Sequence, residues 1–95
     1  MNKYELVVVL NGSLEDDEKS ATMERISNYI TRFGGNVVNV DDWGKKKLAY
    51  EIQKISEAFY TIITFEAPVT APAEIERRVR IMEQVIRFLI VKQEA

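Results

Sequence analysis

Short runs of apolar, β-branched residues alternate along this chain with longer stretches in which apolar residues recur every three or four positions. The run Leu6–Leu10 predicts a buried strand, and Asn11-Gly12-Ser13 predicts a turn after it. Ser13 has an acidic residue three positions further on, which indicates the N-cap of a helix. Gly34-Gly35 is expected to end that helix, because glycine readily adopts the left-handed conformation at a C-terminus. The apolar stripe of the helix consists of Met23, Ile26, Ile30 and Phe33.

The middle of the chain predicts two strands. The first begins at Val37, is interrupted around Gly44, and resumes over Lys47–Ile52. Glycine at such a place indicates a bulge or a bend. Ile55–Glu57 is expected to form a turn. Ala58–Phe65 is rich in aromatic and β-branched residues and therefore predicts another strand.

A second helix and a last strand are predicted for the final third. Pro72 suits the first turn of a helix, and Ile75, Val79 and Met82 follow it at helical spacing. Phe88–Val91 is a short apolar run and predicts the closing strand.

The order strand, helix, strand, strand, helix, strand predicts an α+β fold of the ferredoxin-like β-α-β-β-α-β type. Right-handed crossovers place both helices on one face of a four-stranded antiparallel sheet. The first and third strands are expected in the centre and the second and fourth at the edges. At this length, residues 1–95 are expected to form a single domain.

The sheet face turned away from the helices is left bare in this fold. Side chains alternate between the two faces of a strand, so each strand also contributes to the bare face. The central strands are apolar on both sides, which indicates a surface that binds a partner rather than solvent. Residues expected on this face are Lys3, Glu5, Val7, Val9, Tyr60, Ile62, Arg87, Leu89 and Val91.

The chain has 13 basic and 15 acidic residues, and its net charge of −2 at first argues against a strong nucleic-acid binder. The charges are unevenly spread. Residues 14–31 hold five acids and two bases, whereas residues 44–54 hold four bases and one acid. Residues 74–92 hold five bases and three acids. The net charge is thus an average over an acidic first helix, a basic middle segment and a basic last third. This overall charge predicts weak RNA binding by the isolated chain.

Several kinds of chemistry are excluded by composition. The chain has no cysteine and no histidine, which removes disulfides, thiolate catalysis, the commonest metal ligand and the usual general base near neutral pH. We therefore expect no cofactor, no metal, no small-molecule substrate and no enzymatic activity. The apolar run behind the N-terminus is too short for a signal peptide or a membrane span, so we expect a cytoplasmic protein that does not bind membranes.

The charged and aromatic residues each allow two interpretations. The run Lys45–Lys47 either clamps a phosphate backbone or protects an edge strand from aggregation. Arg78 and Arg80 are expected to pair with Glu74 and Glu76 at i,i+4 spacing.

Arg87 lies on the expected open face and therefore stands out. Trp43 either stacks on a base or packs inside the domain, and packing is the commoner use in a small domain. Base stacking as in RNA-recognition motifs is disfavoured, because the first strand offers no outward aromatic side chain. Asn11-Gly12-Ser13 lacks the glycine pattern of a phosphate loop and is interpreted as a structural turn.

The segment Gly44–Ile52, G-K-K-K-L-A-Y-E-I, resembles the characteristic segment of the bacterial small-subunit ribosomal protein six family. The family pattern is glycine, any residue, a basic residue, a polar residue and then Leu-Ala-Tyr-x-Ile. Lys47 and Gln53 are less usual at their positions, and Glu51 stands where proline is common. The likeness covers nearly the whole chain and includes Tyr4-Glu5, Trp43-Gly44, Phe59-Tyr60 and Arg87-x-x-x-Val91-Lys92.

The resemblance implies a structural component of the small ribosomal subunit. Such a protein pairs with small-subunit ribosomal protein eighteen and binds the central domain of small-subunit ribosomal RNA. On this hypothesis Lys3 and Arg87, expected near each other on adjacent strands, contact phosphates. Lys45, Lys46 and Lys92 are further candidates for RNA contacts. Candidate contacts to the protein partner are Val7, Val9, Tyr60, Ile62, Leu89 and Val91.

Two alternatives remain open on the same fold. One is a regulatory or enzymatic domain that binds a small ligand, although no anion-binding loop is evident. The other is a homodimer formed through the bare face of the sheet.

Overall fold

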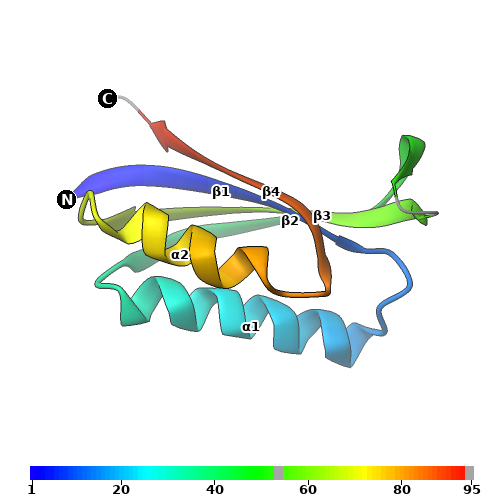
Figure 1. Cartoon of the computed structure of the whole chain (residues 1–95), viewed down its shortest axis with the longest axis horizontal. Coiled ribbons are helices and arrows are strands. Elements are labelled where there is room, and N and C mark those ends of the chain that lie inside the picture. Colours follow the sequence, from blue (N-terminus) through cyan, green and yellow to red (C-terminus); the bar gives the residue numbers. More distant parts are fainter. Residues whose placement is uncertain (53–54, 94–95) are drawn as a thin grey trace.

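The structure is a four-stranded antiparallel sheet with two helices on one face (Figure 1). This computed structural model describes residues 1–52 and 55–93. The strand order β2-β3-β1-β4 puts the first and third strands in the centre, which confirms the predicted ferredoxin-like arrangement. The elements are β1 (Asn2–Asn11), α1 (Asp16–Arg32), β2 (Asn36–Ile52), β3 (Ile55–Ala67), α2 (Ala71–Arg80) and β4 (Val85–Gln93).

The hydrophobic core lies between the sheet and the two helices. Alternate residues of β1 are buried there, and the Tyr4 and Phe65 rings stack with their centroids 5.5 Å apart. Fully burying one such side chain contributes about 1.5–3 kcal/mol to folding. The helices contribute the residues that their apolar stripes predict, namely Ile26, Ile30, Ile75 and Val79.

The first helix begins two residues later than its predicted cap implies. Its N-cap is Glu15, whose backbone N–H donates to the Glu18 carboxylate at 3.1 Å. The prediction of Ser13 as the cap is wrong because Asn11 engages it first. The Ser13 backbone N–H and hydroxyl both donate to Asn11 Oδ1, at 3.0 and 2.6 Å. A side chain that bonds a nearby backbone group in this way makes a local turn in place of a cap.

The second and third strands form one long hairpin that extends past the rest of the sheet (Figure 1). Strand β2 is continuous, so the predicted interruption is wrong, but the register shifts between Asp42 and Gly44. Gly44 has a φ of 76°, as the predicted bulge requires. The predicted turn at Ile55–Glu57 is also wrong, because these residues begin β3 and pair with β2. Gln53 lies outside the described residues.

The arginines of α2 are arranged partly as predicted. Arg80 pairs with Glu76, but Glu74 pairs with Arg77 at 3.2 Å instead of with Arg78. The Arg78 guanidinium lies 5.9 Å from the centroid of the Phe33 ring, at the end of α1. Contact with an aromatic face thus replaces the predicted ion pair.

Gly12, directly after β1, lies close to the backbone of β3. Its N–H donates to the Glu57 carbonyl at 3.1 Å, and a Cβ added at Gly12 would lie 2.4 Å from that same oxygen. By contrast, a Cβ added at Gly44 would meet no atom within 4 Å. A larger residue at Gly12 is therefore disfavoured by lack of space, whereas a larger residue at Gly44 is disfavoured by the backbone conformation.

We expect Gly12→Ala to lower the free energy of unfolding by about 3 kcal/mol or more, because the clashing atom belongs to the backbone. Gly44→Ala is the matched control and should cost about 1 kcal/mol, the price of a left-handed alanine. Urea denaturation of the two variants measures both values. An equal or smaller loss for Gly12→Ala would contradict the close approach.

Candidate RNA and protein interface

The open face of the sheet carries a continuous apolar centre. Residues directly opposite each other on antiparallel strands point to the same side. Val7 lies opposite both Ile62 and Leu89, and these positions alternate with the buried residues of the core. Leu89 is 59% exposed and Val91 46% exposed. The expected outward positions on β1, β3 and β4 are thereby confirmed as one surface.

Val9 contributes less area to this surface than its position suggests. It lies between Tyr60 on β3 and Arg87 on β4, and it is only 7% exposed. Val7 and Val9 line a hollow of about 410 Å³ with three residues of β4. The β4 residues are Arg87, Phe88 and Leu89.

The predicted proximity of Lys3 and Arg87 is wrong. Lys3 lies opposite Gln93 on β4, whereas Arg87 lies opposite Val9. The two positions are six residues apart along the strands, which corresponds to about 20 Å. The antiparallel direction of β4 causes this separation. The end of β4 lies beside the start of β1, and the start of β4 lies beside the end of β1 (Figure 1). Lys3 and Arg87 therefore mark opposite ends of the open face.

The three other candidate lysines do not share one face. Lys46 is exposed and lies opposite Ala58, in line with the open-face positions of β3. Lys45 lies opposite Phe59 on the helix side, and its Nζ is 5.3 Å from the centroid of that ring. Lys92 lies opposite the inward-facing Tyr4 and so belongs to the helix side as well.

The single tryptophan lies on the surface at the bulge of β2. Trp43 is 51% exposed, so the expectation that it packs inside the domain is wrong. Its Nε1–H donates to Asp41 Oδ2 at 2.8 Å, and Asp41 lies opposite the outward-facing Ile62. The indole is therefore on the open-face side of the sheet. Periodicity alone could not place it, because the register shift follows from the backbone of Gly44.

The conformation of the bulge is fixed from the other side of the sheet. The Lys19 ammonium of α1 lies 2.8 Å from Asp42 Oδ2, and the Gly44 backbone N–H donates to Asp42 Oδ1 at 2.9 Å. These two interactions lower the pKa of Asp42, Lys19 most strongly. Asp42 thus remains charged down to a lower pH than an ordinary aspartate and ties α1 to the edge strand.

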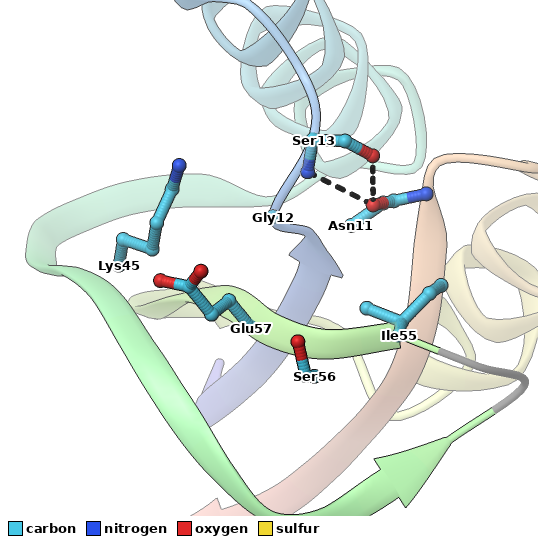
Figure 2. A pocket seen from close by; sticks show the side chains of 7 residues that line it. All are labelled: Asn11, Gly12, Ser13, Lys45, Ile55, Ser56 and Glu57. Carbon is cyan, nitrogen blue, oxygen red and sulfur yellow. Dashed lines mark hydrogen bonds between the residues drawn. The ribbon is translucent and has the colours of Figure 1, made fainter.

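The hollow beside the first turn is not suited to a phosphate group. It has a volume of about 380 Å³, and Figure 2 shows Lys45 and Glu57 on one side and Asn11 and Ser13 on the other. The Asn11 Oδ1 atom already accepts two hydrogen bonds from Ser13. The Glu57 carboxylate adds negative charge that opposes an anion. These features agree with the interpretation of this segment as a structural turn.

Known proteins share both the sequence and the fold of this chain. The sequence model of the family described as Ribosomal protein S6 matches residues 3–92. Small ribosomal subunit protein bS6 of Clostridium kluyveri is 47% identical over 94 residues, which cover 99% of both chains. The same protein of Clostridium botulinum strain 657 is 46% identical and is covered completely, with 99% of this chain aligned.

A solved structure agrees with these sequence relatives. The crystal structure of 30S ribosomal protein S6 from Thermotoga maritima superposes with a TM-score of 0.92 at 27% identity. The match covers 97% of this chain and 87% of that one.

Neither described helix combines the length and the apolar character that crossing a membrane requires. The matched family consists of structural ribosomal proteins and not of enzymes. Because the family model matches residues 3–92 and the relatives align with this chain over 99% of their length or more, this chain belongs to the ribosomal protein S6 family of the small ribosomal subunit.

Proposed function

We propose that this chain binds the central domain of small-subunit ribosomal RNA as a heterodimer with small-subunit ribosomal protein eighteen, in cytoplasmic ribosomes. Membership in the S6 family supports a role in the small subunit, and RNA binding follows from that role. The observation that carries the proposal is the open face, which has an apolar centre between two ends with basic residues.

The apolar centre is the part that suits a protein partner. Val7, Ile62 and Leu89 form a row across three strands, and Val91 continues it along β4. Burying such side chains at an interface is favourable in proportion to the apolar area removed from water. Because the chain carries a net charge of −2, association with a basic partner is also favoured electrostatically.

The two ends of the open face are the parts that suit RNA. Arg87 and Lys46 lie toward one end, and Lys3 lies at the other. Arginine can bind a phosphate through two parallel hydrogen bonds, which lysine cannot do. Since Lys3 and Arg87 are about 20 Å apart along the strands, we expect them to contact different phosphates. Lys45 and Lys92, on the helix side, remain weaker candidates.

Leu89→Asp should weaken binding to ribosomal protein eighteen at least tenfold, because the new carboxylate loses its water in the interface without gaining a partner. Ile81→Asp is the matched control, since Ile81 is 77% exposed at the end of α2 and far from the open face. Isothermal titration of the two purified proteins measures both affinities. Equal affinities for the two variants would exclude the apolar centre as the interface, and a dimer of the isolated chain in sedimentation would favour the homodimer instead.

Replacing Lys3 and Arg87 together by alanine should reduce the salt dependence of RNA binding by the heterodimer. Each lost phosphate contact lowers the slope of log K against log salt by about one unit. Arg77→Ala removes one positive charge from the helix side, where Arg77 pairs with Glu74, and should leave the slope unchanged. Filter binding to a central-domain RNA fragment at several salt concentrations gives the slopes. The assignment fails if the double variant and the wild-type chain have the same slope.

A further inference from the structure

The bulge of β2 presents an aromatic ring on the open face, beside a position that has no side chain. Trp43 and Gly44 together oppose the single residue Tyr60 on β3, as expected where one strand holds an extra residue. Tyr60 faces outward because it lies opposite Val9 and alternates with the buried Phe59. Trp43 and Tyr60 thus occupy neighbouring positions on the same side of the sheet.

The space in front of this bulge is open. A Cβ built at Gly44 meets no atom within 4 Å, and the left-handed φ of Gly44 disfavours any larger residue there. The indole edge is held in place by the hydrogen bond from Nε1 to Asp41. An exposed aromatic ring that is fixed at one edge offers its face for stacking, and every base has a π-face of its own.

Lys46 provides a positive charge near the bulge on the same face. Lys46 is two residues beyond Gly44 on the same strand, so it lies about 7 Å away along the open face. Asp41 is a negative group on this face, and one of its carboxylate oxygens accepts the indole hydrogen bond. The combination of an aromatic face with a neighbouring lysine is typical of sites that bind single-stranded nucleic acid.

The bulge lies at the edge of the surface proposed for the protein partner, next to the β3 residues Tyr60 and Ile62 of that surface. The most exposed apolar residues of that surface, Leu89 and Val91, lie on β4. Strand β2 is at the opposite edge of the sheet, three strand spacings or about 14 Å away. A partner centred on β4 and β1 that reaches Tyr60 and Ile62 on β3 therefore leaves the edge strand at Trp43 open to RNA.

We propose that Trp43 stacks on an unpaired base of RNA and that Lys46 holds the phosphate of the same or the adjoining nucleotide. This inference rests on the proposed function and names a particular contact within it. It also revises the expectation that base stacking on the open face is disfavoured. That expectation considered aromatic residues of the central strands, whereas the stacking ring comes from an edge strand.

The contact can be observed directly, because Trp43 is the only tryptophan of the chain. We would incorporate 5-fluorotryptophan and record the ¹⁹F resonance at low salt during titration with a ten-residue oligoadenylate. Stacking should shift the resonance through the ring current of the base. An abasic oligomer of the same length carries the same phosphates and should cause little shift. Equal shifts with the two oligomers, or no shift with either, would overturn the proposal.

The energetic contribution is measured in the heterodimer. Trp43→Leu should weaken binding to the central-domain RNA fragment about 5- to 150-fold, the range for loss of one base–aromatic stack. Trp43→Phe keeps an aromatic face and should retain most of the affinity, and Ile81→Ala serves as the exposed apolar control. Unchanged RNA affinity of the Trp43→Leu variant would contradict the inference but leave the proposed function standing.

The labelled chain also separates an RNA contact from a protein contact. If ribosomal protein eighteen alone shifts the ¹⁹F resonance and RNA then causes no further change, Trp43 contacts the protein partner and the inference is wrong. If the wild-type heterodimer does not bind the RNA fragment at all, the proposed function fails. The oligoadenylate titration still tests the stacking site in that case.

Discussion

Strand β1 is the constraint on which the rest of the structure depends. It pairs with β3 on one side and β4 on the other, and its inward residues Leu6 and Val8 are completely buried beneath the helices. Its outward residue Val7 is also apolar, although within residues 1–52 and 55–93 no helix or strand covers that face (Figure 1). A strand that is apolar on both sides fits a sheet that is covered on both sides. The described part of the chain supplies one of the two layers, namely the helices.

Much of this arrangement follows from the sequence, because alternation along a strand has a period of two and is insensitive to small errors in its ends. The outward positions on β1, β3 and β4 are all as predicted. The distance between Lys3 and Arg87 depends instead on pairing register and strand direction, and it was mispredicted. The cap of α1 was misplaced for a different reason, since Ser13 has two possible hydrogen-bonding roles and Asn11 decides between them. The exposed position of Trp43 could not be predicted, because the extra residue of the bulge changes which residues of β3 lie opposite β2.

The distribution of charge agrees with a protein that acts beside a partner. The acidic first turn of α1 lies on the covered side of the sheet, where negative charge also stabilises the positive end of the helix dipole. The basic residues of the open face lie on the other side. These basic residues are few, and the net charge of −2 on the chain gives no long-range attraction to RNA. Stable RNA binding is therefore expected only when a second protein adds its own contacts.

Hydroxyl-radical footprinting of this chain, in isolation and within assembled small subunits, tests most directly whether the open face is the interface. We expect Leu89, Val91 and Trp43 to become protected on assembly. The exposed residues Val69 and Ile81, which flank the two ends of α2, should react as in the isolated chain. Protection of Ile81 and Val69 with continued reactivity of the open-face residues would contradict this expectation.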